Sequence, residues 1–266
     1  MRQVTLAVGL VALCSLAIPA HAGTLRCPPD SVKVGNVCID TYEASAWQIP
    51  PSNAALVRRV QQGKATLADL TAAGATELSG CGNAPANFPT DGNWTPVSGS
   101  NPPSPGVYAV SIPGVKPTAC ISWFQANQAC LLSGKRLLTN REWQGAAAGT
   151  PDPGTDNLTT DCAVASPGPV NSGSRSSCKS SWGVFDMVGN VNEWVADWTD
   201  RASVCTGWLG GDASCFGGSG SGASNQIPGA LMRGGDWNYV FSGVFMVDAT
   251  LAPSEATPIV GFRCAR

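Results

Sequence analysis

The chain has 266 residues, with 16 lysines and arginines against 18 aspartates and glutamates, and only 13% of its residues are charged. A charge balance this close to neutral, without clustered basic residues, predicts binding neither to nucleic acid nor to an anionic membrane. The one histidine, His21, lies in a segment that we expect to be removed, which excludes a Ser-His-Asp triad and a His-ligated metal from the mature protein.

Residues 1–22 have the pattern of a secretory signal peptide. Arg2 supplies a positive charge, residues 4–18 are apolar, and Ala20-His21-Ala22 is a small-x-small cleavage site. We therefore expect export to the periplasm or the extracellular space. No later apolar run approaches the roughly 20 residues of a membrane-spanning helix.

Of the 11 cysteines, Cys14 lies in the signal peptide and ten remain. Leu13 disfavours lipid attachment at Cys14, because a lipoprotein signal has a small residue there. An even number of cysteines in an exported chain is typical of structural disulfides. Spacing suggests three local pairs: Cys27 with Cys38, Cys162 with Cys178, and Cys205 with Cys215. A free catalytic thiol among the ten is the alternative.

The residue types in the N-terminal half of the mature chain predict short strands and helices. Residues 27–45 indicate a strand pair that turns at Gly35-Asn36. The residue types that follow predict one or two helices over 52–78, a loop over 79–106 and a strand over 107–110.

Two further helices have clear start signals. Ser122 is followed three residues later by Gln125, and Thr139 by Glu142, which is the spacing of a capping box. We expect the first of these helices to end at Gly134. After residue 149 the composition favours turns and short strands.

The most informative stretch, residues 182–194, places the carboxylates of Asp186 and Glu193 among aromatic and apolar residues, on either side of a Gly189-Asn190 turn. Buried carboxylates need a partner. A hard cation bound by both carboxylates and by carbonyls of the turn would provide one, and Ca²⁺ tolerates such irregular oxygen geometry. Equally, each carboxylate could cap backbone N–H groups or pair with an arginine, and the residues alone leave both alternatives open.

Four sequence blocks resemble the sulfatase-modifying-factor family, whose founding members are formylglycine-generating enzymes with a variant C-type lectin fold. The blocks are Ile39-Asp40-Thr41-Tyr42-Glu43, residues 121–143, residues 183–198, and Arg233-Gly234-Gly235-Asp236-Trp237 with Gly261-Phe262-Arg263-Cys264. The resemblance implies a loop-rich, disulfide-stapled α+β domain over residues 23–266. Within it, residues 47–116 match only loosely and are expected to be an insertion.

The resemblance also implies a calcium site and one long-range disulfide. The calcium ligands would be the side chains of Asp186 and Glu193 and the carbonyls of Gly189 and Val191. The family joins the positions of Cys130 and Cys264, which leaves Cys81 for Cys120.

The catalytic cysteines of the family have no counterpart in this chain. Formylglycine-generating enzymes use two cysteines shortly after the Gly-Gly motif to bind copper and to engage the substrate cysteine. Tyr239 and Val244 occupy those positions here. Neither side chain can bind Cu(I) as a thiolate or form a mixed disulfide, so we expect no copper.

The segment that replaces the active site, residues 236–260, resembles the variable stretch of relatives that are targets of diversity-generating retroelements. Its ends match their fixed Arg-Gly-Gly-x-Trp-Asn entry and Gly-Phe-Arg-Cys exit. An ordinary core strand and loop is the alternative. The expected ligand-binding residues lie within 236–251 and are Asp236, Trp237, Asn238, Tyr239, Phe241, Met246 and Asp248.

The combined expectation is a non-catalytic exported domain that binds a protein or another surface ligand through residues 236–251. An oxidoreductase of the formylglycine-generating type, acting on a protein cysteine or another substrate, is the alternative from a different class. It would need a redox centre with free thiols. A structural envelope or adhesion component with one fixed partner is a third possibility.

Overall fold

The structure is a computed structural model that describes residues 25–78, 106–200, 228–240 and 242–266. Its elements in chain order are β1 (Ser31–Val34), β2 (Val37–Asp40), β3 (Ser45–Ile49), α1 (Ala54–Gln61), α2 (Leu67–Ala72), β4 (Thr76–Glu77), β5 (Gly106–Val110), α3 (Trp123–Leu132), β6 (Arg136–Leu137), α4 (Asn140–Ala146), β7 (Asn192–Asp200), β8 (Pro228–Arg233), β9 (Val247–Asp248), β10 (Val260–Phe262) and β11 (Cys264–Ala265). Within the described ranges they form three small sheets, which confirms the α+β, loop-rich class.

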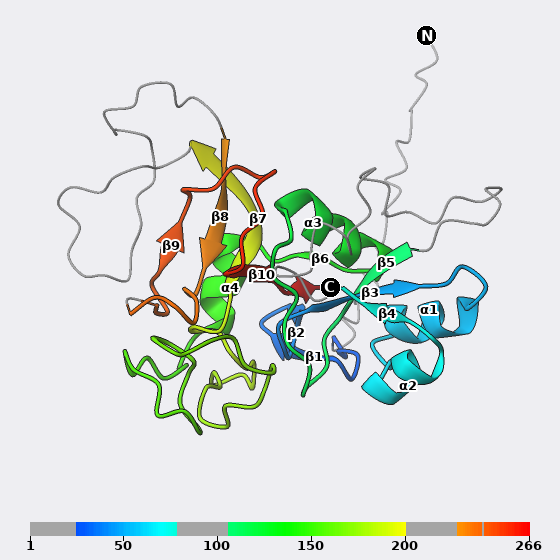
Figure 1. Ribbon diagram of the computed structural model, residues 1–266, viewed down its shortest axis with the longest axis horizontal. Coiled ribbons are helices and arrows are strands. Elements are labelled where there is room, and N and C mark those ends of the chain that lie inside the picture. The colour runs from blue at the N-terminus through cyan, green and yellow to red at the C-terminus, as the bar shows by residue number, and fades with distance from the viewer. Residues whose placement is uncertain (1–24, 79–105, 201–227, 241) are drawn as a thin grey trace, which may run out of the picture.

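The first sheet, β1-β2-β11-β6, brings the two ends of the domain together. β1 and β2 are antiparallel and turn at Gly35, whose φ of 61° favours glycine, so the predicted strand pair is confirmed. β11 pairs with β2 on one side and with β6 on the other. The C-terminal strand therefore lies between the N-terminal hairpin and the strand that follows α3 (Figure 1).

The second sheet, β10-β7-β8-β9, has β7 near its centre. β7 is parallel to β10, with Asn192 beside Val260, and antiparallel to β8, with Glu193 beside Arg233. Parts of two of the four sequence blocks thus become neighbouring strands. Figure 1 shows this sheet on one side of the molecule, above the long loops that precede β7, with β3, β5, α1 and α2 on the other side.

The third sheet, β4-β3-β5, and helices α1 and α2 occupy the loosely matched region. The expected helices over 52–78 are therefore two, each with a side-chain cap at Asn53 or Thr66. The expected loop over 79–106 lies almost entirely outside the described residues, because only Gly106 is described and it begins β5.

Both predicted capping boxes are confirmed. The Ser122 and Thr139 side chains each accept a hydrogen bond from the backbone three residues later, and Gln125 and Glu142 bond back. α3 ends at Leu132, two residues before Gly134, which adopts a φ of 67°. Because these bonds are local, the residue types were sufficient to predict them.

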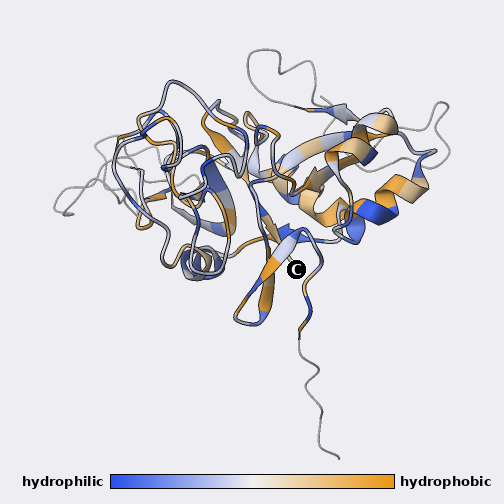
Figure 2. Cartoon of the chain, turned by 90° about the horizontal axis from the view of Figure 1, so that it is seen from below, coloured by the Kyte–Doolittle hydropathy of each residue, from blue (hydrophilic) through white to orange (hydrophobic). Residues whose placement is uncertain are grey.

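The interior is apolar and rich in tryptophan. Trp194 and Phe262 are fully buried in one cluster with residues of α3 and β5, whereas Trp143 packs in a second cluster with Ile39 and Met187. In Figure 2 the helices and strands carry most of the hydrophobic colour, while the long loops are largely pale or hydrophilic. The hydrophobic contacts of both clusters join segments far apart in the sequence.

Disulfides fasten the loops and the chain ends. The structure confirms Cys27–Cys38, Cys162–Cys178 and the family pair Cys130–Cys264, which links α3 to β11 across 134 residues. Cys120 is also disulfide-bonded. Its expected partner Cys81, the pair Cys205 and Cys215, and the signal peptide lie outside the described residues. Within the described ranges no helix is long and apolar enough to cross a membrane.

A buried ionic cluster joins the first sheet to α3. The Lys135 Nζ lies 2.6 Å from both Asp30 Oδ2 and Asp40 Oδ1, and the Arg266 Nη1 lies 3.0 Å from Asp30 Oδ1. Asp40 Oδ2 also accepts a hydrogen bond from the Cys264 N–H. Burial raises the pKa of Asp40 to about 6, although Lys135 opposes the shift.

This pKa predicts a specific dependence of stability on pH. The folded protein keeps the Asp40 proton up to about pH 6, whereas the ordinary pKa of 3.8 applies to the unfolded chain. The Asp40 contribution to the free energy of unfolding is therefore present below pH 4 and falls by roughly 3 kcal/mol as the pH rises to 7. Thermal unfolding of the wild-type protein and of Asp40→Asn between pH 4 and 8 would measure it. The wild-type protein should lose stability relative to the variant across this interval, and a constant difference would contradict the prediction.

Candidate functional site

The centre of the 183–194 block is an ion pair between Glu193 on β7 and Arg263, which lies between β10 and β11. Both side chains are 1% exposed. The Arg263 Nε donates to Glu193 Oε2 at 2.7 Å, and the Trp143 Nε1 donates to the same oxygen at 2.8 Å. For Glu193, pairing with an arginine was one of the two alternatives left open by the sequence, and the structure contains that pair.

Asp186 lies at the edge of this ion pair. Its backbone is left-handed, with a φ of 58°, and its Oδ2 accepts a hydrogen bond from the Gly173 N–H at 2.6 Å. Burial raises the pKa of Asp186 to about 7, while the Gly173 N–H and the Arg263 guanidinium oppose the shift.

Glu43, which belongs to the first sequence block but was not among the expected site residues, completes the group. Its carboxylate accepts hydrogen bonds from the Asn190 side chain at 2.5 Å and from the Val191 N–H at 3.2 Å. Burial raises its pKa well above the ordinary value, and the charges of Asp186 and Glu193 raise it further. In the sequence, the sign that Glu43 would be buried was its position next to small and aromatic residues. The neighbouring residues did not indicate which distant groups would contact its carboxylate.

The turn between Asp186 and Glu193 is tightly enclosed. A Cβ on Gly189, whose φ is 72°, would lie 2.3 Å from the Ala163 carbonyl oxygen, so only glycine fits. Among the described residues, the Gly189 and Val191 carbonyls and the second Asp186 oxygen accept no hydrogen bond. The same part of the chain contains no group of three acidic, cysteine or histidine side chains that could hold a metal, so a cation here would depend on these carbonyls.

The carboxylates of this group outnumber its guanidinium groups. Glu43, Asp186 and Glu193 supply three carboxylates that interact with one another, and Arg263 is the guanidinium in their midst. Arg175, the other arginine that acts on Asp186, is already paired with Asp156. Burial raises the pKa of Glu43 and Asp186, so the two uncompensated negative charges are present only when both carboxylates are ionised. A divalent cation at the turn would then balance them, and carboxylate and carbonyl oxygens are the donors that Ca²⁺ takes.

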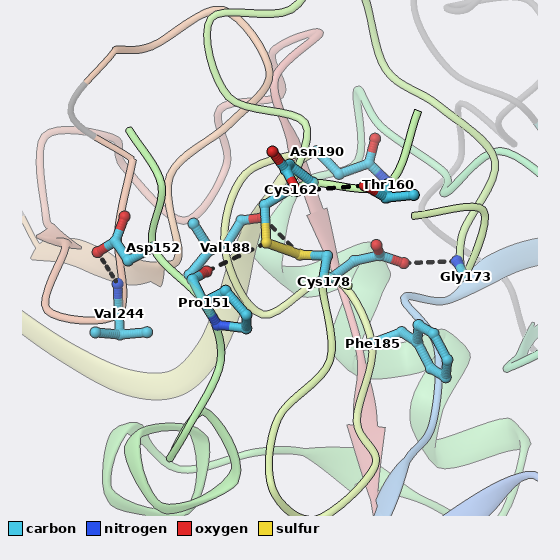
Figure 3. Close-up of a disulfide and its surroundings, with 12 residues drawn as sticks. Pro151, Asp152, Thr160, Cys162, Gly173, Cys178, Phe185, Val188, Asn190 and Val244 are labelled. Atoms are coloured by element: carbon cyan, nitrogen blue, oxygen red, sulfur yellow. Dashed lines mark hydrogen bonds between the residues drawn. A yellow bond between two sulfur atoms is a disulfide. The ribbon is translucent and has the colours of Figure 1, made fainter. Parts of the chain in front are cut away.

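The two positions that correspond to catalytic cysteines have different surroundings. The Tyr239 side chain is 43% exposed. Val244 is half-buried and packs against the Cys162–Cys178 disulfide, and its N–H donates to Asp152 at 3.4 Å (Figure 3). All seven cysteines in the described ranges are disulfide-bonded, so none of them provides the free thiol that redox chemistry would need.

The segment over residues 236–251 divides into buried and exposed side chains. Asp236 and Met246 are each 3% exposed, and Asp236 binds the Asn192 side chain and the Asn238 N–H. Of the other expected ligand-binding residues, Asn238 and Tyr239 are exposed, Trp237 and Asp248 are half-buried, and Phe241 lies outside the described residues.

Two exposed residues of this segment were not among those expected. Val240 is 52% exposed and Phe245 is 65% exposed. Residues 244–247 form a continuous apolar run in the sequence. The structure divides it, because Phe245 faces outward while Met246 enters the core.

Comparisons with known proteins agree with this architecture. A family model described as the sulfatase-modifying factor enzyme 1-like domain matches residues 17–266. No curated protein matches the chain.

Three solved structures illustrate the structural likeness. The Major Tropism Determinant I1 variant is 21% identical, with a TM-score of 0.40, over 60% of this chain and 45% of its own. The variable protein 1 of Treponema denticola is 18% identical, with a TM-score of 0.40, over 86% of this chain and 84% of its own. CarF is 20% identical, with a TM-score of 0.37, over 57% of this chain and 68% of its own. This chain thus spans less than half the length of the I1 variant.

Proposed function

Since the chain belongs to the sulfatase-modifying factor enzyme 1-like family, we propose that it keeps the family scaffold and uses it for binding instead of catalysis. The observation that carries this proposal is the pair Tyr239 and Val244 at the positions of the catalytic cysteines. A phenol and an isopropyl group cannot bind Cu(I) or exchange disulfides. Export is part of the proposal and is supported by the signal-peptide pattern and by the structural disulfides.

The proposed binding surface consists of the exposed side chains Asn238, Tyr239, Val240 and Phe245. Aromatic and aliphatic side chains that remain exposed next to one another in the chain favour contact with a partner. Buried neighbours support them: the Ser242 Oγ donates to the Asp236 carbonyl at 2.7 Å and lies 2.9 Å from the Tyr239 carbonyl. A surface held in this way loses little conformational freedom on binding.

The absence of catalysis can be measured directly. Purified protein, supplied with copper, oxygen and a cysteine-containing sulfatase peptide, should leave the cysteine unconverted, because no thiol is present at residues 239 and 244. Mass spectrometry of the peptide would detect conversion, and an active formylglycine-generating enzyme would serve as the positive control. Formation of formylglycine would refute the non-catalytic proposal.

The binding surface can be tested on ligands selected by the wild-type protein from a glycan array and a random-peptide phage library. Tyr239→Ala and Phe245→Ala should each weaken binding at least tenfold, because each removes a large apolar contact. Leu131→Ala is the matched control, since Leu131 is 53% exposed on α3, outside this surface. Titration calorimetry would compare the three variants. Ligands that bind all three as they bind the wild-type protein would place the binding site elsewhere.

We also propose that a Ca²⁺ ion binds at the turn, through Asp186, Glu193 and the carbonyls of Gly189 and Val191. The ion would stabilise the turn by balancing the buried carboxylates, and it would take no part in a reaction. The support is the excess of carboxylates over guanidinium groups and the unused oxygens of the turn. Since Arg263 already contacts Glu193, Asp186 is the more informative position to change.

Chelation should therefore lower the melting temperature. At calcium concentrations about 100-fold above the dissociation constant, binding stabilises the fold by roughly 2.7 kcal/mol, or about 5 to 10 °C for a domain of this size. Asp186→Asn should abolish the difference between calcium and chelator, and asparagine tolerates the left-handed backbone of this position. Glu77→Gln is a control carboxylate far from the turn in the fold. Equal melting of the wild-type protein with and without chelator would count against the site.

A further inference from the structure

A hollow of about 580 Å³ lies between α4 and the segment that leads into β9. We call it the α4 hollow. It is lined by Asn140, Arg141, Gln144, Arg233, Phe245 and Val247, with Gly145 at its edge, and contains two arginines but no carboxylate. A second hollow of about 500 Å³ shares Arg141 and Gly145 with it and is also lined by Trp182 and by the carboxylate Glu142. Both volumes fall in the range of ligand sites in proteins, roughly 300 to 1,000 Å³.

Arg233 differs from the other buried arginines described. Arg263 pairs with Glu193, and Arg175 pairs with Asp156 at 2.8 Å. Within the described ranges Arg233 forms no ion pair, although it is only 1% exposed. Among the described residues it is therefore a buried positive charge without a counter-charge.

The groups around the Arg233 guanidinium are neutral. It donates to the Met246 carbonyl at 2.6 Å, to the Val244 carbonyl at 3.3 Å and to the Gln144 Oε1, and it stacks over the Trp143 ring at 4.5 Å from the ring centroid. Its Nε has no hydrogen-bond partner in the described chain. Carbonyl dipoles and an aromatic face stabilise a guanidinium, but they do not cancel its charge.

The neighbouring carboxylates are engaged elsewhere. Glu193 is the cross-strand neighbour of Arg233, yet its oxygens bind Arg263 and Trp143. Glu142 binds Arg136 at 2.6 Å, and Asp197 accepts from the Asn140 N–H. The exposed Arg141 adds a second positive charge at the rim of the hollow. The α4 hollow is consequently a positive site, and Phe245 and Val247 are the apolar side chains of its lining.

We propose that the α4 hollow binds a carboxylate side chain of a protein partner, a glutamate or aspartate flanked by apolar residues. The carboxylate would lie between Arg141 and Arg233, near the position of the Gln144 amide. Its apolar neighbours would contact Phe245, which is 65% exposed, and Trp182, which is 46% exposed. The inference rests on the proposed binding function, because Phe245 and Val247 belong to residues 236–251.

Gln144→Glu is the decisive variant, because it places a carboxylate next to Arg233 without a change in size. The variant should melt several degrees above the wild-type protein, since it provides the missing counter-charge, and it should no longer prefer acidic ligands. Gln144→Met removes the amide without adding charge, so its melting temperature should not rise and its preference for acidic ligands should persist. An unchanged or lower melting temperature for Gln144→Glu would overturn the proposal.

Binding is measured by titration calorimetry with a capped tripeptide of phenylalanine, glutamate and phenylalanine, and with its glutamine counterpart. The glutamate peptide should bind the wild-type protein at least tenfold more tightly. Arg141→Ala should remove this preference, whereas the exposed control Arg58→Ala on α1 should keep it. Phenylacetate tests the alternative ligand, a small free carboxylic acid. If the α4 hollow binds free acids, it should bind phenylacetate as tightly as it binds the glutamate peptide. Equal binding of the two peptides, or tight binding of phenylacetate alone, would refute the protein-partner proposal.

The proposal for the α4 hollow and the proposal for the binding surface can be refuted separately. If selected ligands lose affinity in Tyr239→Ala but not in Gln144→Glu or Arg141→Ala, the binding surface stands and the α4 hollow is not part of it. If none of these variants loses affinity for the selected ligands, both proposals are wrong.

Discussion

The ion pair between Glu193 and Arg263 is the contact on which the rest of this structure depends. A buried charge is tolerated only with a partner, so β10 must lie where Arg263 reaches β7. The Arg263 guanidinium also donates to the Asp40 carbonyl at 3.2 Å and the Phe185 carbonyl at 2.8 Å, and Trp143 binds the same glutamate. One network therefore joins residues of all four sequence blocks, which explains why these blocks occur together in one fold.

In the segment that follows the Gly-Gly motif, the buried side chains hold the backbone in place and the exposed side chains are available to contact a partner. Asp236, Ser242 and Met246 point inward and fix the backbone, while Tyr239 and Phe245 point outward. Replacement of the family cysteines leaves this support intact, because Val244 packs against the Cys162–Cys178 disulfide as an ordinary apolar side chain. A scaffold of this kind can change its outward residues at little cost to stability, which suits a binding protein.

The three buried charge clusters differ in how well their positive and negative charges balance. Lys135 and Arg266 balance Asp30 and Asp40, so that cluster is complete and structural. The carboxylates around Arg263 exceed their guanidinium, whereas Arg233 has no carboxylate at all among the described residues. The two imbalances have opposite signs. The two proposed ligands, a cation at the turn after Asp186 and a carboxylate in the α4 hollow, are both argued from the cost of an uncompensated charge in a medium of low polarity.

Residue types and their spacing were sufficient to predict the features whose partners are close in the chain. The capping boxes at Ser122 and Thr139, the turn at Gly35 and the neighbouring disulfides depend on contacts within a few to sixteen residues, so residue type and spacing predict them. The resemblance to a family added the long-range pair Cys130–Cys264. The remaining contacts depend on the fold. Glu43 contacts Asn190 across 147 residues, and Arg233 has no counter-charge within the described ranges, because Glu193 turns toward Arg263. Phe245 and Met246 are adjacent and similar in hydropathy, yet one lies at the surface and the other in the core. Such outcomes depend on which distant groups the fold brings within reach, and short-range patterns in the chain do not contain that information.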